Sequence, residues 1–149
     1  LVSRCEEIPG WEVFKYYDNN GERKVLDSHM VNEYLHQISG EYFSAKDFRT
    51  WGASIVFFEN LMEIGISTDE KEIKKNIVKA YDATAEALGN TRNVCKNYYV
   101  HPLLVSTYED GSIQHYFDKV KKSRSTRKYF SRSESAFAEL IEKFQVNLL

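Results

Sequence analysis

Apolar residues recur along most of the chain at the spacing of helices that bury one face. The first such stretch follows Asp27 and Ser28, either of which can cap a helix, and it ends at Gly40, where a terminating glycine belongs. Its apolar positions are Val31, Leu35 and Ile38. The pattern therefore predicts a helix with one apolar stripe, from a cap at Asp27 or Ser28 to Gly40.

A second and longer apolar stretch begins at Ser44, with Asp47 three residues later as its capping partner. Its apolar residues are Phe48, Trp51, Ile55, Phe58, Leu61 and Met62. Because they occupy much of the helix circumference, we predict that this helix, which ends near Gly65, is the central buried one.

A third long helix is predicted from a cap at Ser67 or Thr68 to Leu88, just before Gly89. Its inner stripe is Ile73, Ile77, Tyr81, Thr84 and Leu88. Shorter helical segments are predicted at 92–98, at 102–108, near Tyr116 and at 133–144. Before these helices, residues 12–17 form a short strand or an extended lead-in to a turn at residues 18–21.

Few breakers interrupt these patterns, since the 149 residues include 7 glycines and 2 prolines. We therefore predict a mainly α fold, a single helical domain over residues 1–149 with little or no strand. No apolar run approaches the roughly 20 residues that span a bilayer, so no membrane partner is expected. Cys5 and Cys95 are expected to be reduced intracellular thiols.

A net charge of −2 argues mildly against a nucleic-acid partner, but the average hides a basic segment. Between residues 119 and 132 there is no acid, and the basic residues are Lys119, Lys121, Lys122, Arg124, Arg127, Lys128 and Arg132. Such a segment either contacts phosphates or is a solvated loop, and charge alone does not decide between them.

Several kinds of site are absent from the sequence: a phosphate-binding glycine loop, a zinc-binding histidine pair and a serine-hydrolase elbow. Two segments remain as candidates for chemistry. Arg49 stands in the first turns of the apolar helix, where it either reaches a surface carboxylate or waits for a phosphate. Tyr98 and Tyr99 either pack or supply a nucleophile, which requires help to lose the phenol proton.

The order of these segments resembles the type IB DNA topoisomerases of bacteria and large DNA viruses. The similarity runs from about Cys5 to Pro102 and rests most on Lys46–Trp51, Leu88–Thr91 and Tyr99–Pro102. It also includes Ile8-Pro9-Gly10, Glu12, Phe14, and the stretch from Val31-Asn32-Tyr34-Leu35 to Ile38-Ser39-Gly40.

The resemblance implies that Tyr99 attacks a DNA phosphodiester and forms a 3′-phosphotyrosyl link, which a free 5′-hydroxyl later reverses to relax supercoils. It implies that Arg49 stabilises the transition state, that Asn90 does so where many relatives have histidine, and that Lys46 supports the DNA backbone. No ATP, metal or other cofactor is expected. We expect double-stranded DNA as the partner, a monomeric protein, and a cytoplasmic location, at a bacterial nucleoid or its viral equivalent.

The family also uses an upstream arginine, and an upstream lysine that lies on a β-hairpin and acts as general acid, and neither has a match in this chain. We therefore expect the chain to be the C-terminal part of a catalytic domain, without the N-terminal domain that clamps DNA, and to be severely impaired alone. Two alternatives stay open. One is a tyrosine recombinase or integrase, although such enzymes typically carry His-x-x-Arg where this chain has Lys46–Arg49. The other is a non-catalytic DNA-binding module.

Overall fold

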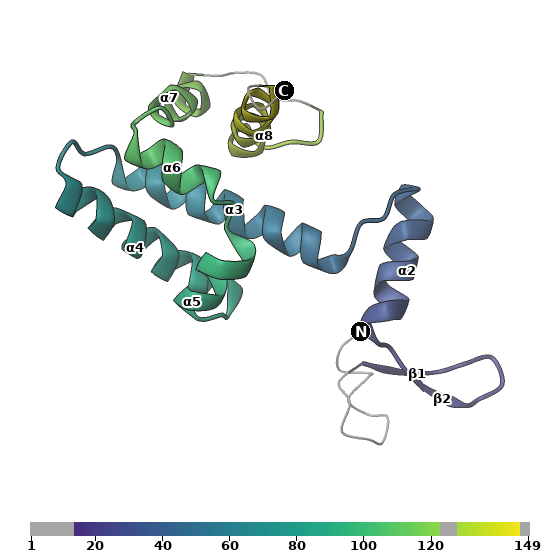
Figure 1. Cartoon of the computed structure of the whole chain (residues 1–149). Helices are drawn as coiled ribbons and strands as arrows, with labels where there is room; N and C mark the ends of the chain where they lie inside the picture. Colours follow the sequence, from purple (N-terminus) through teal and green to yellow (C-terminus); the bar gives the residue numbers. More distant parts are fainter. Residues whose placement is uncertain (1–13, 123–127, 147–149) are drawn as a thin grey trace. The chain divides into compact units, whose positions relative to one another are not determined.

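The computed structural model describes residues 14–122 and 128–146 of the chain. The chain forms two compact units, residues 1–48 and residues 49–149. Figure 1 shows the elements of both units. The boundary between them falls inside one helix, α3 (Ala45–Ile64).

The described part of the first unit contains a small hairpin, one complete helix and the start of α3. Strand β1 (Lys15–Tyr17) pairs antiparallel with β2 (Arg23–Val25), with Lys15 opposite Val25. The predicted turn joins them, and the Asp18 carboxylate accepts hydrogen bonds of 2.9 Å from two backbone N–H groups of the turn. The first strand was one of two predicted options. The second strand was not predicted, because its three residues are all exposed and show no alternation.

Helix α2 (Ser28–Ser39) follows the hairpin and has the predicted ends. Asp27 caps it by accepting from the Met30 N–H at 2.9 Å, and Gly40 ends it in the left-handed region at φ 73°. The apolar positions of α2 are only partly covered: Val31 and Leu35 are half-buried, no residue of the helix is fully buried, and Ile38 is 63% exposed. The described residues of this unit therefore cover the apolar side of α2 only in part.

The second unit is built around α3, as the sequence predicted. Its helices after α3 are α4 (Glu70–Leu88), α5 (Arg92–Val94), α6 (Leu103–Glu109), α7 (Gln114–Lys122) and α8 (Arg132–Val146), with a π-helical turn, η1 (Cys95–Tyr99), between α5 and α6. The predicted cap of α4 is wrong: Asp69 caps it and accepts from the N–H groups of Lys71 and Glu72. Ser67 instead donates to the Glu72 carboxylate at 2.8 Å.

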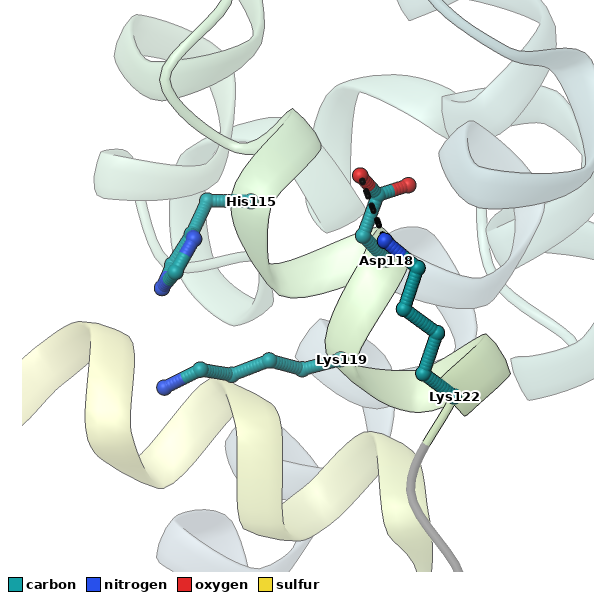
Figure 2. A pocket seen from close by; sticks show the side chains of 4 residues that line it. All are labelled: His115, Asp118, Lys119 and Lys122. Atoms are coloured by element: carbon teal, nitrogen blue, oxygen red, sulfur yellow. Dashed lines mark ion pairs between the residues drawn. The ribbon is translucent and has the colours of Figure 1, made fainter.

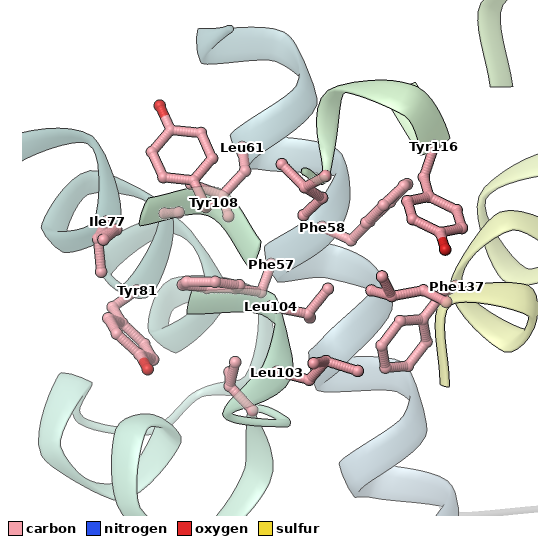
Figure 3. Packing of buried hydrophobic residues seen from close by; sticks show 14 of the residues in the cluster. Phe57, Phe58, Leu61, Ile77, Tyr81, Leu103, Leu104, Tyr108, Tyr116 and Phe137 are labelled. Atoms are coloured by element: carbon pink, nitrogen blue, oxygen red, sulfur yellow. The ribbon is translucent and has the colours of Figure 1, made fainter. Parts of the chain in front are cut away.

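The hydrophobic core lies where these helices meet. Figure 3 shows Phe57, Phe58 and Leu61 of α3 between side chains of α4 and α6 on one side and Tyr116 and Phe137 on the other. A buried aromatic side chain removes about 150–250 Å² from water, so these rings contribute strongly to the packing of the unit. Phe48 departs from the predicted apolar set, since it is 57% exposed.

The fold class is therefore mainly α, as predicted, with the β1–β2 hairpin as the strand structure of the described residues. Among those residues, no helix is long and apolar enough to cross a membrane.

Candidate active site

Arg49 is fixed by the end of another helix. It lies near the start of α3, and its Nη2 donates a hydrogen bond of 2.7 Å to the carbonyl oxygen of Leu88, the last residue of α4. The last carbonyls of a helix lack partners within it and carry partial negative charge, so a guanidinium there is favourable. In the described part of the chain no carboxylate forms an ion pair with Arg49. The other N–H donors of the Arg49 guanidinium are therefore available to bind an anion.

The turn after α4 explains why a glycine stands before Asn90. Gly89 has φ 62°, a left-handed conformation that costs an L side chain about 1–2 kcal/mol. Its N–H and that of Asn90 return to the carbonyls of Glu86 and Ala85, which ends the helix. The carbonyl of Leu88, the last residue of the helix, accepts from Arg49 instead.

Asn90 carries the one buried side-chain polar atom without a partner among the described residues. This atom is the amide Nδ2, and it is shielded from solvent although the residue as a whole is only half-buried. A buried donor without an acceptor costs about 1–3 kcal/mol, and such groups are rare enough to require an explanation. A phosphate oxygen would provide the missing acceptor.

The segment after Asn90 is fixed to α4. Thr91 caps α5 by accepting from the Val94 N–H at 3.3 Å. Arg92 then makes two hydrogen bonds to the Asp82 carboxylate, of 2.5 and 2.7 Å. Both side chains are about half exposed, so the pair contributes little to stability, but its two-point geometry sets the orientation of α5 against α4.

Tyr99 is the last residue of the π-helical turn. The Val100 N–H bonds to the carbonyl oxygen of Cys95 at 2.9 Å, five residues back, which is the π-helical spacing. Cys95 and Val100 are buried, so the turn is anchored in the core at both ends while Tyr99 is half-buried. Tyr98, by contrast, is 62% exposed. Single π-helical turns inside helical segments are rare and occur often at functional sites.

Arg49 and Tyr99 meet in space although 50 positions separate them. The guanidinium carbon of Arg49 lies 5.3 Å from the centre of the Tyr99 ring, within the range of a cation–π contact. The structure thus brings together two of the residues that the sequence singled out. The third, Asn90, stands two residues after the Leu88 carbonyl that holds Arg49.

Two other titratable side chains near Tyr99 in the sequence stay neutral near pH 7. Burial raises the pKa of the Cys95 thiol above its usual value, and the charge of Arg49 offsets this only in part. Burial lowers the pKa of His101 below its usual value. The described cysteine is therefore a buried thiol that does not compete as a nucleophile, while Cys5 lies outside the described residues.

Lys46 belongs to the other compact unit, since the boundary falls after residue 48. It is exposed on the first turn of α3. Asp47 in the same motif is a cap: its carboxylate accepts from the Ser44 N–H at 2.8 Å and from the Ser44 hydroxyl at 2.7 Å, as predicted. The hydrogen bond from the Ser44 hydroxyl is the main reason that the pKa of Asp47 is lowered.

A separate hollow of about 360 Å³ lies along α7 and contains none of these residues. Figure 2 shows its lining side chains, His115, Asp118, Lys119 and Lys122. Lys119 pairs with Glu139 of α8, and Lys122 lies 3.9 Å from Asp118. The charges of Lys119 and Lys122, at the start of the basic segment, are thus partly neutralised. Arg124 and Arg127 lie outside the described residues. Contact between the basic segment and DNA phosphates therefore stays a prediction. Among the described residues no cluster of metal ligands is present.

Sequence reasoning missed three parts of the site. One is the Leu88 carbonyl, a backbone group that leaves no signal in residue type. The second is the π-helical turn, which was predicted as part of an ordinary helix over residues 92–98. The third is Ser54, whose hydroxyl accepts a hydrogen bond of 3.0 Å from the His101 N–H. A serine amid the apolar positions of α3 was a signal that could have drawn notice.

Comparison with known proteins agrees with the resemblance found in the sequence. The family model of the eukaryotic DNA topoisomerase I catalytic core matches residues 1–131. DNA topoisomerase 1B of Acanthamoeba polyphaga mimivirus is 33% identical over 117 residues, which cover 74% of this chain and 35% of that relative. The chain therefore spans little more than a third of the relative's length. On the extent of the match with the family model, this chain belongs to the type IB DNA topoisomerase family.

Proposed function

We propose that this chain is the nucleophile-bearing, C-terminal part of a catalytic domain that cleaves and rejoins one strand of double-stranded DNA. The observation that carries the proposal is the contact between Arg49 and Tyr99, at 5.3 Å from guanidinium carbon to ring centre. A cation held beside a phenol is what an attack on a phosphodiester requires, because the phosphate gains negative charge in the transition state.

In the proposed reaction, the Tyr99 oxygen attacks the phosphorus and loses its proton to solvent. The bond from phosphorus to the 5′ oxygen breaks, and that oxygen leaves as a hydroxyl after taking up a proton. The 3′ side of the strand stays linked to Tyr99 as a phosphodiester, so the bond energy is retained and no ATP or metal is consumed. The freed 5′ end swivels and its hydroxyl then attacks the link, which restores the strand and releases Tyr99.

Arg49 and Asn90 have defined tasks in this scheme. The Leu88 carbonyl holds one edge of the Arg49 guanidinium, and the other donors grip a non-bridging phosphate oxygen. The unpaired Nδ2 of Asn90 donates to phosphate oxygen, which relieves the cost of a buried donor. Asn90 carries no charge, so its contribution is a hydrogen bond alone. Lys46 is proposed to contact the DNA backbone.

The remainder of the site is proposed to come from outside this chain. A general acid for the leaving 5′ oxygen has no counterpart among the residues here that match the family, and such a group is worth about 10² to 10⁴ in rate. We propose that the chain is monomeric, acts on DNA in the bacterial cytoplasm or its viral equivalent, and is weakly active alone.

The test is a suicide-substrate assay in which the scissile strand is nicked shortly 3′ of the cleavage site, so that the short fragment carrying the 5′-hydroxyl diffuses away and the covalent adduct is trapped. The reaction contains EDTA and no ATP, and a denaturing gel is scored for protein–DNA adduct. Tyr99→Phe should abolish the adduct in the longest natural form of the protein. Tyr98→Phe, which changes the exposed neighbour, is the matched control and should leave the adduct intact.

Two results would contradict the proposal. Adduct formation by Tyr99→Phe would place the nucleophile elsewhere. Absence of an adduct from every form would favour a non-catalytic DNA-binding module. Robust relaxation of supercoiled DNA by this chain alone would leave the nucleophile assignment standing but would sink the expectation that half of the site is missing.

A further inference from the structure

The position of the Tyr99 phenol depends on the backbone that carries it. A displacement of about 1 Å in a reacting group can reduce a rate by about 100-fold, so the segment on each side of a nucleophile must be held. On the N-terminal side the π-helical turn does this, through the buried Cys95 and its bond from the Val100 N–H. On the C-terminal side the backbone at His101 is held by a residue of a different helix.

That residue is Ser54, which is 1% exposed on α3. Its hydroxyl oxygen accepts a hydrogen bond of 3.0 Å from the His101 N–H, 47 residues away in sequence. The hydroxyl proton has two acceptors in reach, the Thr50 carbonyl at 2.9 Å and the Tyr99 carbonyl at 3.4 Å. The first is the shorter bond and the second is a weaker alternative, since one proton serves both. One side chain therefore contacts the backbone both at Tyr99 and two residues beyond it.

The same helix also carries Arg49. Helix α3 is continuous from Ala45 to Ile64, so the guanidinium and the Ser54 hydroxyl are parts of one rigid element. A shift of the Tyr99 segment along α3 would break the bond between Ser54 and His101 and would change the contact of 5.3 Å between Arg49 and the Tyr99 ring. Ser54 thus couples the position of the nucleophile to the position of the cation.

We propose that Ser54 is a positioning residue for Tyr99, an inference that rests on the proposed cleavage reaction. It does not contact the reacting atoms. It holds the backbone beside Tyr99 against α3, so that the phenol meets a phosphate that Arg49 holds.

Thr84 offers a matched comparison because it is a buried helical hydroxyl without this link. It is 0% exposed on α4 and donates at 2.7 Å to the Ala80 carbonyl, one turn back in its own helix. Losing either hydroxyl removes a buried hydrogen bond, but only Ser54 bonds to the backbone that carries Tyr99. Variants of Ser54 and of Thr84 that lack the hydroxyl should therefore both lose stability. Only the Ser54 variant should also lose the positioning of Tyr99.

The experiment compares Ser54→Val with Ser54→Thr in the longest natural form, with Thr84→Val as control. Valine and threonine have nearly the same shape, so the pair differs only in a methyl group that replaces the hydroxyl. The measurements are the dissociation constant for a suicide substrate and the single-turnover rate constant for adduct formation. We expect Ser54→Val to reduce the rate constant by about 10- to 100-fold relative to Ser54→Thr, with DNA affinity unchanged within about 2-fold. Thr84→Val should lower the melting temperature without this loss of rate.

The outcomes separate the two proposals. If the wild-type protein forms the Tyr99 adduct and the two Ser54 variants cleave equally, the positioning role is wrong and the proposed function stands. Equal rate losses in Ser54→Val and Thr84→Val also contradict the positioning role. An unreactive wild type overturns both proposals. If the added methyl group prevents folding, Ser54→Ala against Thr84→Ala answers the same question, because alanine removes the hydroxyl without adding volume.

Discussion

The two compact units of this chain differ most in how much they bury. In the described part of the first unit, Lys15 is the only buried residue, while Tyr34, Ile38, Tyr42 and Phe48 are all more than half exposed. The second unit has a continuous core of aromatic and aliphatic side chains from α3 to α8. A close-packed core fixes the positions of the residues attached to it. Catalytic residues that need a fixed geometry are therefore expected in the second unit. Arg49, Asn90 and Tyr99 all lie there.

The family motif crosses from one unit to the other. Lys46 belongs to the first unit and Arg49 to the second, three positions later on the same helix. The residue proposed to contact the DNA backbone therefore lies outside the core unit, and the residue proposed to act on the phosphate lies inside it. This difference can be tested by paired changes, one in each unit.

The largest effect is expected from the core. Phe57→Ala removes a ring that is 0% exposed and should reduce the free energy of unfolding by ~3–5 kcal/mol. Phe48→Ala, on the same helix but 57% exposed, should change it by no more than ~0.5 kcal/mol. Urea unfolding of both variants checks this. Similar losses in the two would mean that Phe48 is covered in solution and that the contrast between the units is wrong.

The next effect separates chemistry from binding. Arg49→Ala should reduce the rate constant for adduct formation by about 100- to 1000-fold, because a fixed donor to the developing charge is lost. Lys46→Ala should mainly weaken DNA binding. It should also reduce the slope of the logarithm of the binding constant against the logarithm of the salt concentration by about one. Single-turnover rates and binding titrations at several salt concentrations distinguish these outcomes. A larger rate loss for Lys46→Ala than for Arg49→Ala would reverse the proposed roles.

A smaller effect is expected at two helix ends with the same geometry. Gly40 and Gly89 are both left-handed, at φ 73° and 62°, and neither has an atom within 4 Å of an added Cβ. Alanine at either position should cost about 1–2 kcal/mol of stability from backbone strain. Only Gly89→Ala should also slow adduct formation, since it moves the Leu88 carbonyl and Asn90. Equal rates in the two variants would show that the end of α4 does not position the site.

The smallest effect is a dependence of stability on pH in the second unit. Burial lowers the pKa of His101 below its usual value of 6.5, so between the folded and unfolded values the unfolded chain binds more protons. The contribution of His101 to the free energy of unfolding is fully present above about pH 6.5. It is lost as the pH falls through the pKa of His101 in the folded protein. Glu134 acts in the same direction below its usual pKa of 4.5, chiefly because the Ser131 N–H binds its carboxylate.

Thermal unfolding between pH 7.5 and 5 measures the contribution of His101. The melting temperature should fall with pH, and His101→Asn should flatten this dependence. His29→Asn is the control in the first unit, since it changes an exposed histidine. A pH dependence that survives His101→Asn would assign the titration to another group.

The helices were predictable because their ends carry strong local signals. Asp27 and Gly40 bracket α2, and Gly89 closes α4, since a capping carboxylate and a left-handed glycine act within a few residues. The start of α4 was misassigned because Ser67, Thr68 and Asp69 can all cap and stand in a row. The π-helical turn has no such signal, because its bond depends on the burial of Cys95 and Val100 in the core.

The candidate site was predictable in part. The order of the motifs identified Arg49, Asn90 and Tyr99, but only the fold shows that Arg49 meets the Tyr99 ring. The hydrogen bond from Arg49 to the Leu88 carbonyl could not be predicted, because a backbone acceptor leaves no signal in the residue types. The contact between Ser54 and His101 joins residues 47 positions apart, and nothing in the local sequence links them.

The most direct test of the paired roles of Arg49 and Tyr99 is to identify the residue that becomes linked to DNA. The adduct trapped on the nicked duplex is digested with nuclease and protease, and the peptides are analysed by mass spectrometry. We expect a nucleotide linked through its 3′ phosphate to Tyr99, in the peptide that contains the π-helical turn. A nucleotide on Tyr98 or on any other residue would contradict the central claim that Arg49 and Tyr99 form the cleaving pair.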